Sequence, residues 1–467
     1  MNSYKKLLNN SIIFAIGNLG SKIIGILMVP LYTYYFTTAD YGRLDLITTT
    51  VNLIVPICTL SIFESAFRFA MDKSENPKSV LTNSLLVTII GIFILILLSP
   101  FFNFNESISK SYLYVLLLIS FQSIQVLLAQ FVRAVNYIRL FSINGIIMAI
   151  SLAGLNIISI VYLKMGLNGY LLSLVLSNLL AIIIFIIFGK LWKFIDITLI
   201  KKDFIYQLLL YSIPLIPNTF LWWLTNVSNR YFIVFFLGAS ANGLFAVANK
   251  IPTLLSMLNS IFTQAWQISA VEEFDKKDKN FYSDMFNVLA FLLFFGSSMI
   301  LVVLKPVFSI IIANSFYESW KYVPVLLLSV IYSSFSNFYG VNYLAAKKTI
   351  GVLKTTIYGG VVNIILNIIL IPMIGLNGAG LATMLSFFVI WLLRIKDSKN
   401  LITINIDMRK LLMMTLILFL QIVVLYLNLS LFLEVIVNFI LCVSFIFVGR
   451  KYFILILKKI GVNKWNN

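Results

Sequence analysis

Long apolar stretches alternate with short polar segments along the whole chain of 467 residues. The stretches are continuous in Leu, Ile, Val and Phe, without the two-residue alternation of barrel strands. Many reach about 20 residues, the length that a helix needs to cross a bilayer. We therefore predict an all-α integral membrane protein with about fourteen transmembrane helices, at about 11–33, 44–66, 80–102, 112–132, 141–163, 169–189, 205–236, 242–268, 285–312, 322–344, 351–373, 377–393, 411–428 and 432–449.

Composition supports this prediction. The chain is 60% hydrophobic and 11% charged, whereas a soluble protein carries about 25% charged residues. The first apolar stretch is too long for a signal-peptide core and no A-x-A site follows it, so we expect it to stay as a span. Cys58 and Cys442 both fall in predicted spans, so no disulfide is expected. The chain has no histidine, which excludes histidine metal sites, bases and proton relays.

The polar segments alternate in charge. Those on one side of the predicted membrane hold 27 of the 35 Lys and Arg residues, and those on the other side, with the span-end Lys305, hold five. By the positive-inside rule the basic side is cytoplasmic, and both termini lie there. The net charge of +18 therefore reflects topology, with anionic lipid headgroups as its partners. We expect no nucleic-acid binding.

Two short polar motifs occur twice. GLNG stands at 166–169 and again at 375–378, each time between two apolar stretches. FTTADYG at 36–42 and FLGASANG at 236–243 repeat with a similar offset. Gly and Asn tolerate the left-handed backbone of tight turns, so chance matches between loops are the alternative explanation.

A true repeat would make the chain two six-helix bundles in the same orientation, which is a transporter design with the substrate path between the lobes. We predict an N-terminal bundle at 1–197 and a C-terminal bundle at 198–397 around a central cavity. Residues 398–467 would add two helices and a basic tail.

Three basic residues fall inside spans: Lys22, Arg230 and Lys250. Ionisable residues in spans usually face a bundle interior or a water-filled cavity, although a long side chain can also extend to the membrane surface. Glu64 and Arg68 lie four residues apart near the inner end of the second span, where they would face one another on a helix. Either they form an internal ion pair or Arg68 lines the inner mouth of the cavity.

A cavity lined by these basic residues favours an anionic headgroup such as a diphosphate, through charge-assisted hydrogen bonds. A cavity for cationic drugs would need acids in the same places. The candidate substrate-binding residues are therefore Lys22, Lys250, Arg230, Arg68 and Glu64.

Prolines inside the spans, including Pro214 and Pro217 in the seventh, indicate either structural kinks or hinges for alternating access. The sequence shows no Walker loop, no paired carboxylates in an outer loop and no metal-ligand cluster. We expect a transporter without catalytic residues, metal or cofactor. Coupling to a cation gradient or to the membrane potential stays open.

Three stretches carry a resemblance to a known family: NLGSKIIGILMVPLYTYYFTTADYG at 18–42, ESAFRFAMD at 64–72 and GLFAVANKIPTLLSMLNSIFTQAWQ at 243–267. With the rest of the chain they resemble the bacterial polysaccharide-biosynthesis flippases of the Wzx type, in the multidrug/oligosaccharidyl-lipid/polysaccharide exporter superfamily. The resemblance implies two six-helix bundles around a cavity with basic residues, matching Lys22, Arg68 and Lys250 by position. We see no membrane-embedded acid in the first lobe, which departs from many drug-exporting relatives.

The implied activity is transfer of an undecaprenyl-diphosphate-linked oligosaccharide from the inner to the outer leaflet of the bacterial cytoplasmic membrane. The expected partners are this lipid-linked substrate, the bilayer and the glycan polymerase and glycosyltransferases of the same pathway, and we expect a monomer. Two alternatives stay open: a cation-coupled multidrug exporter of the same superfamily, and a membrane-embedded glycan polymerase or glycosyltransferase. The last would need a large catalytic outer loop, whereas every predicted outer loop is short.

Overall fold

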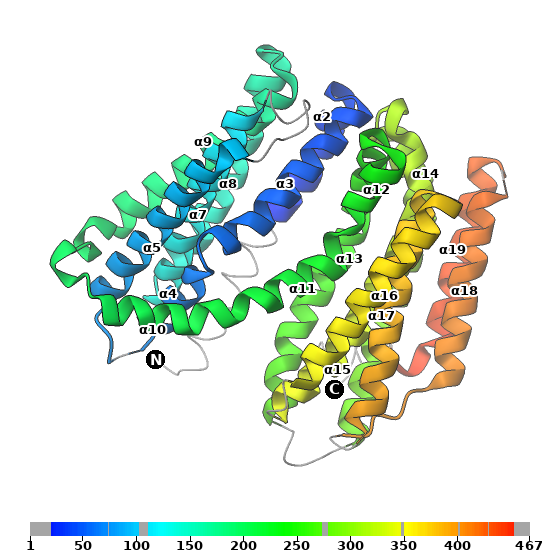
Figure 1. Cartoon of the computed structure of the whole chain (residues 1–467). Helices are drawn as coiled ribbons and strands as arrows, with labels where there is room; N and C mark the ends of the chain where they lie inside the picture. Colours follow the sequence, from blue (N-terminus) through cyan, green and yellow to red (C-terminus); the bar gives the residue numbers. More distant parts are fainter. Residues whose placement is uncertain are drawn as a thin grey trace, which may run out of the picture. The chain divides into compact units, whose positions relative to one another are not determined.

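The computed structural model describes residues 20–72, 74–101, 111–272, 279–346, 350–399, 402–427 and 429–452. These residues form helices joined by loops and contain no strand (Figure 1), which confirms the all-α prediction. The chain divides into two compact units, Met1–Trp223 and Leu224–Asn467. The predicted borders after residues 197 and 397 stay predictions.

Besides the helical stretch at residues 20–27, the first unit contains eight described α-helices and the first part of a further one. They are α2 (Val29–Tyr35), α3 (Thr38–Cys58), α4 (Ile62–Ala70), α5 (Pro77–Leu98), α7 (Tyr112–Ala134), α8 (Ile138–Asn156), α9 (Gly166–Gly189), α10 (Lys202–Ser212) and the start of α11 (Ile216–Val227). The second unit contains α12 (Asn229–Leu237), α13 (Ala239–Glu272), α14 (Lys279–Ile311), the 3-10 segment η6 (Asn314–Tyr322), α15 (Val323–Ala345), α16 (Ile350–Ile374), α17 (Leu376–Ser398), α18 (Met408–Tyr426) and α19 (Leu431–Val448).

Twelve helical segments of the described residues are long and apolar enough to cross a membrane, or 13 if the bent pair α3–α4 counts as one span. They coincide with the predicted spans from the second to the fourteenth. The first predicted span, 11–33, lies partly outside the described residues. The chain is therefore a multi-pass membrane protein, and the count of fourteen stays a prediction.

The second span is broken, although the apolar pattern predicted one continuous helix. Between α3 and α4 the axis bends by 61°, and Leu60 and Ser61 take left-handed φ angles of 50° and 51°. Pro56 lies just before this break and lacks an amide proton. The Val55 carbonyl accepts from both the Thr59 amide at 3.1 Å and Thr59 Oγ1 at 2.8 Å. The Leu60 amide then donates to the Ile57 carbonyl at 3.1 Å, so the regular helical pattern ends at Leu60.

Both copies of GLNG adopt a similar geometry. The first glycine of each, Gly166 and Gly375, has a left-handed φ of 56° and 63° and turns the chain into α9 or α17. The second glycine of each packs close to the preceding segment of its own unit. A Cβ at Gly169 would lie 3.1 Å from the Ser159 carbonyl oxygen, and one at Gly378 would lie 2.3 Å from the Leu370 carbonyl oxygen. Superposition of the two halves stays a prediction.

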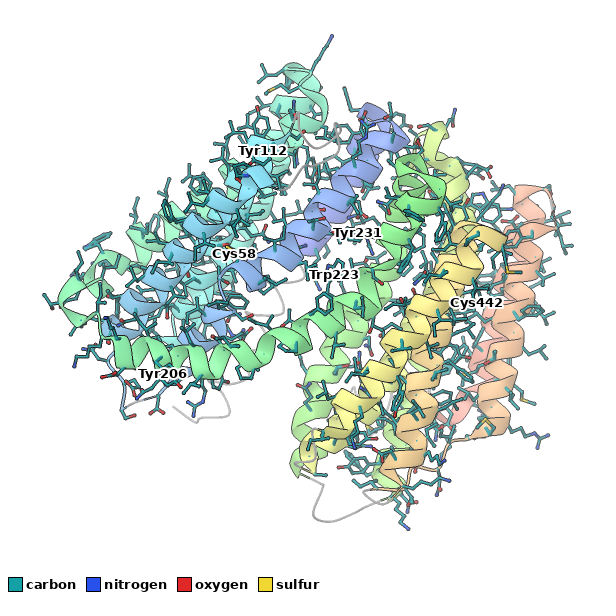
Figure 2. All side chains as sticks on the ribbon, viewed as in Figure 1. Cys58, Tyr112, Tyr206, Trp223, Tyr231 and Cys442 are labelled. Atoms are coloured by element: carbon teal, nitrogen blue, oxygen red, sulfur yellow. The ribbon has the colours of Figure 1, made fainter. Side chains whose placement is uncertain are left out.

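The predicted seventh span is composed of several segments. It changes from α10 to a 3-10 turn at Ile213–Leu215, where Pro214 lies, and continues as α11 and α12. α10 packs in the first unit, where Ser65 Oγ on α4 donates to the Leu208 carbonyl at 2.6 Å. The division between the units falls within α11, after Trp223 (labelled in Figure 2).

Each unit has its own apolar interior. In the first, buried side chains of α4, α5, α7 and α9 form a cluster that includes Leu81, Phe131 and Phe185. In the second, aromatic rings dominate, and Trp266 stacks on Phe338 with ring centroids 4.3 Å apart. Polar and charged side chains inside the units are therefore exceptions that need partners.

Candidate functional site

Lys22 lies on the helical stretch at residues 20–27, and its side chain is exposed. Among the described residues no hydrogen-bond or ion-pair partner contacts its ammonium group. Lys22 is thus a cation within a predicted span, and the described residues of the first unit do not use its hydrogen-bonding capacity.

Glu64 and Arg68 both lie on α4, but the expected ion pair between them is wrong. Arg68 Nη1 instead lies 3.7 Å from Asp72 Oδ2, one turn further along. The cation whose charge acts on the half-buried Glu64 carboxyl is Arg133, near the end of α7. Arg133 also lies over the Phe67 ring, with Cζ 4.4 Å from the ring centroid.

The Arg68–Asp72 pair lies at the surface. The side chains are 55% and 43% exposed, and such pairs contribute little to stability. Asp72 follows α4, outside the spanning helices, and accepts hydrogen bonds from Ser74 N at 3.1 Å and Ser74 Oγ at 2.8 Å. Hydrogen bonds from Ser74, with a smaller effect of Arg68, lower the pKa of the Asp72 carboxyl. Arg68 is therefore already neutralised by a neighbour of its own segment.

An acid that the sequence analysis missed lies in the first unit. Asp45 stands about two turns inside α3, because this helix begins at Thr38 rather than at the predicted residue 44. Its charge acts on Tyr41 and Tyr170. The start signal for this helix was present in the sequence: Thr37 caps it by accepting a hydrogen bond from the Asp40 amide at 3.1 Å, a typical N-cap.

The aromatic residues near Asp45 form a hydrogen-bonded group. Asn156 Nδ2 donates to the Tyr32 hydroxyl at 2.9 Å, and the Tyr32 and Tyr170 rings meet edge to face at 5.1 Å. Both Tyr32 and Asn156 are buried. The first unit therefore contains a polar interior with one carboxylate beside it, so the expectation of no acid in this lobe was wrong.

Arg230 and Lys250 lie in the second unit, on α12 and α13, and both are half-buried. Arg230 Nη1 donates to Asn229 Oδ1 at 3.4 Å, and Asn229 Nδ2 donates to Thr383 Oγ1 on α17 at 3.3 Å. Arg230 thus borders a neutral polar contact between α12 and α17. Lys22 and Lys250 belong to different units, so their convergence on one cavity stays a prediction.

Buried amides continue this polar contact into α16. Ser228 Oγ donates to Asn363 Oδ1 at 3.4 Å, and Asn367 Nδ2 donates to the same oxygen at 2.8 Å. All three side chains are buried. Hydrogen bonds of this kind hold membrane helices together specifically, so they fix α12 on α16.

The predicted span 377–393 left Arg394 outside a helix, and this boundary was wrong. Arg394 lies inside α17 and is 4% exposed. Its guanidinium donates to acceptors on two other helices. On α15 the Ser336 carbonyl accepts from Nη1 at 2.7 Å, and on α16 Thr355 and Thr356 hydroxyls accept from Nε and Nη2 at 3.0 and 3.2 Å. This arginine therefore binds three helices of the second unit together.

A buried ion pair in the second unit was also not predicted. Lys305 Nζ on α14 lies 2.6 Å from Glu434 Oε2 on α19, with side chains 12% and 3% exposed. From the sequence, Lys305 was expected at a span end, and Glu434 had no expected role. The signal was an acid and a base in separate apolar stretches, but one sequence does not show which spans are neighbours.

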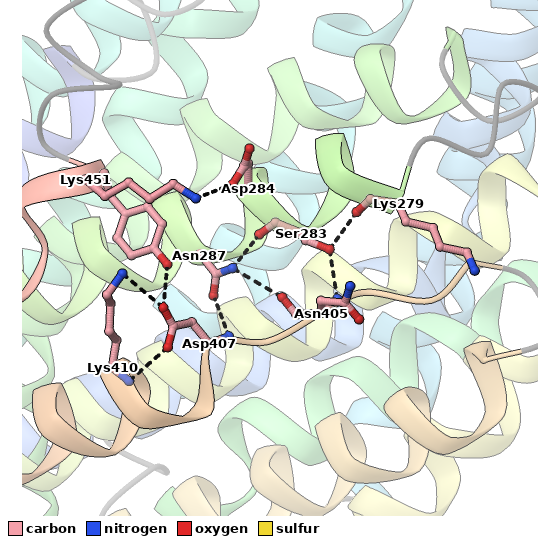
Figure 3. A network of polar contacts seen from close by, with 9 residues as sticks. Lys279, Ser283, Asp284, Asn287, Asn405, Asp407, Lys410 and Lys451 are labelled. Atoms are coloured by element: carbon pink, nitrogen blue, oxygen red, sulfur yellow. Dashed lines mark hydrogen bonds and ion pairs between the residues drawn. The ribbon is translucent and has the colours of Figure 1, made fainter.

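A polar network joins α14 to the linker that precedes α18 (Figure 3). Ser283 Oγ accepts from the Asn405 amide at 2.8 Å, and Asn287 Oδ1 accepts from the Asp407 amide at 3.2 Å. Asp407 precedes α18 and also accepts from Lys410 Nζ at 3.0 Å and from the Tyr452 hydroxyl at 3.2 Å. Burial acts to raise the pKa of the Asp407 carboxyl, but hydrogen bonds from Lys410 and Tyr452 outweigh it and lower the pKa.

Among the described residues no three His, Cys, Asp or Glu side chains gather closely enough to hold a metal ion. The candidate groups for ligand binding among the described residues are charged and amide side chains.

Comparisons with known proteins agree with the helical membrane fold. The family described as "Polysaccharide biosynthesis protein" matches residues 7–267. No curated protein matches the chain at a significant level. Among solved structures, the lipid II flippase MurJ in an inward closed conformation has 15% identity and a TM-score of 0.69, covering 95% of this chain and 100% of that one.

Two transporters have the same fold. An inward-facing multidrug resistance MATE family transporter of the MOP superfamily has 13% identity and a TM-score of 0.65, with coverage of 81% of this chain and 95% of that one. A MOP superfamily transporter from Pyrococcus furiosus, described as having a binding pocket of reverse polarity, has 14% identity and a TM-score of 0.60, covering 84% of this chain and 95% of that one. At these identities the comparisons establish the fold.

Proposed function

Since this chain belongs to the polysaccharide biosynthesis protein family, we propose that it is a flippase that moves an undecaprenyl-diphosphate-linked oligosaccharide across a bacterial cytoplasmic membrane for envelope polysaccharide synthesis. The observation that carries the proposal is the fold shared with a lipid II flippase over 95% of the chain. Both termini would be cytoplasmic, in keeping with the basic loops. Glycosyltransferases and a polymerase would supply and consume the substrate.

In this mechanism the isoprenoid tail stays in the bilayer while the sugar-diphosphate head crosses the membrane by alternating access. Lys22 is the first residue expected to bind the diphosphate, because its ammonium is exposed and has no protein partner among the described residues. Lys250 and Arg230 would contribute from the second unit. Arg68 is a weaker candidate, since Asp72 pairs with it.

A cation-coupled exporter is the second candidate, and Asp45 is the observation that favours it. This carboxylate lies inside a spanning helix of the first unit, and acids in spans often carry protons or bind cationic substrates. Structures of multidrug transporters share the fold. In a flippase, Asp45 would instead serve coupling to an ion gradient.

The test is complementation of a flippase-deficient strain of the matching sugar pathway, with membrane levels of each variant checked by immunoblotting. Lys22→Ala and Lys250→Ala should impair surface glycan, and Lys22→Glu and Lys250→Glu should impair it more because they repel a diphosphate. Lys22→Arg should be the mildest change, since it keeps the charge and alters the geometry. Lys193→Glu, at an exposed lysine in the 3-10 segment Leu191–Phe194 of the first unit, is the matched control.

Normal surface glycan from a well-expressed Lys22→Glu, Lys250→Glu double variant would contradict diphosphate binding by these lysines. Drug resistance that depends on Asp45 in a strain with unchanged surface glycan would favour the exporter.

A further inference from the structure

α18 and α19, together with the linker that precedes α18, contact α14 near both of its ends. At one end lies the linker network around Ser283 and Asn287 (Figure 3), and at the other end lies Lys305. The 22 residues between Ser283 and Lys305 correspond to roughly 33 Å of α-helix, close to the hydrocarbon thickness of about 30 Å. α18 and α19 are thus attached at positions one membrane thickness apart.

The attachment at Lys305 uses three kinds of contact. Its ammonium lies 2.6 Å from the Glu434 carboxylate on α19 and donates to the Leu425 carbonyl on α18, also at 2.6 Å. It also lies 4.4 Å from the centroid of the Trp320 ring. One lysine therefore contacts α18, α19 and η6, while it extends from α14.

Further polar side chains lie between these two ends. Gln421 Nε2 on α18 donates to the Asn438 carbonyl on α19 at 2.9 Å, and both side chains are fully buried. On α14, the buried Ser298 lies beside the Cys442 thiol of α19. These helices therefore contact one another through polar groups at several depths. Apolar residues alone would not favour helix–helix contacts over contacts with lipid tails, which are equally apolar.

We propose that the Lys305–Glu434 ion pair is a lock that fixes α18 and α19 on α14, so that the C-terminal helix pair moves with the second unit as one body. Removal of either partner leaves the other charge buried and unpaired, which is far more damaging than removal of both. The proposal concerns the packing of the second unit and does not depend on the substrate.

The two partners are not equivalent. Lys305→Met leaves the Glu434 carboxylate buried without its cation. Glu434→Gln leaves the ammonium with the Leu425 carbonyl, the Trp320 ring and a neutral amide oxygen in place of the carboxylate. The lock therefore predicts a larger effect for Lys305→Met than for Glu434→Gln.

Cys442 offers a natural reporter of this attachment. It lies on α19 in the second unit (Figure 2), is 7% exposed and has a free thiol. In a Cys58→Ala background it is the single cysteine of the chain, so a fluorescent maleimide that enters detergent micelles reports its exposure. The measurement is the labelling rate of the purified full-length chain at a temperature well below unfolding.

We expect Lys305→Met to raise the labelling rate of Cys442 by about tenfold or more, and Glu434→Gln to raise it less. The Lys305→Met, Glu434→Gln double variant should label more slowly than the product of the single effects predicts, because the pair acts as a unit. Lys321→Met and Glu318→Gln form the matched control, since this exposed pair on η6 has side chains 40% and 56% exposed.

Equal labelling of wild type and of both single variants would overturn the lock, and so would single effects that simply multiply in the double variant. A change of the same size in the control pair would also count against it. If Lys305→Met does not reach the membrane, the nearly isosteric Glu434→Gln variant still tests the lock through the labelling rate of Cys442.

Discussion

Gly91 is a position where one methyl group should be costly. Gly91 lies on α5, and a Cβ built there would lie 2.1 Å from the Cys58 carbonyl oxygen and 3.0 Å from its carbonyl carbon. Unbonded carbon and oxygen atoms approach to about 3.3 Å, so α5 and the end of α3 would have to separate by about 1 Å. The contact partner is backbone at the break before α4 and cannot rotate away.

The expected magnitude follows from two opposing effects. Overpacking of a well-packed site destabilises the fold by about 1–3 kcal/mol. Alanine in place of a helical glycine stabilises the helix by up to about 1 kcal/mol. Gly91→Ala should therefore be destabilising by about 1–2 kcal/mol. Gly145→Ala in α8 isolates the second effect, because nothing lies within 4 Å of a Cβ there, and it should stabilise slightly.

The assay is the apparent melting temperature of the detergent-solubilised chain, read as loss of the monodisperse peak in fluorescence-detected size exclusion. All variants are heated at one fixed rate, because melting of such proteins is usually irreversible. Gly91→Ala should melt below wild type, and Gly145→Ala at or above it. If Gly91→Ala melts as high as Gly145→Ala, the close contact between α5 and the break does not exist as described.

Two further predictions concern the second unit. Arg394→Lys should lower the apparent melting temperature, with a loss of about 1–3 kcal/mol, because one ammonium cannot bind acceptors on both α15 and α16 as the guanidinium does; a wild-type melting temperature would contradict this role. The lowered pKa of Asp407 means that its contribution to stability is complete above the ordinary value of 3.8 and is lost as pH falls through the lower folded value. Asp407→Asn should thus be less stable than wild type at neutral pH, and the difference should shrink below about pH 4; a difference that is independent of pH would refute the assignment.

The sequence was sufficient to predict the helical membrane fold because the pattern that carries it is local. Each apolar stretch reports its own span, and the structure places a helix on the predicted spans from the second to the fourteenth. The GLNG turns were also predictable, since Gly166 and Gly375 both need a left-handed backbone. The break after Cys58 was less visible, because its close contact is with Gly91, which is distant in sequence.

The candidate site was harder to predict, because the role of a charge depends on its neighbours in space. Glu64 and Arg68 have the spacing of a helical ion pair, yet Arg68 pairs with Asp72 and the charge acting on Glu64 is Arg133. Arg394 has the position of a loop residue because the predicted span ended at 393, whereas α17 continues to Ser398. Errors of a few residues in the predicted helix boundaries thus placed buried charges at the surface.

The distribution of intramembrane charges now separates structural cations from candidate binding cations. Lys305 is neutralised by Glu434, and Arg394 is fully buried and held by hydroxyl and carbonyl oxygens. A cation that is held on all sides by its own protein cannot reach a substrate without breaking those bonds. Lys22 differs because its side chain is exposed and has no partner among the described residues. Since an unpaired ammonium facing hydrocarbon is costly, Lys22 should face water or an anionic headgroup, which makes it the residue whose replacement tests the flippase proposal most directly.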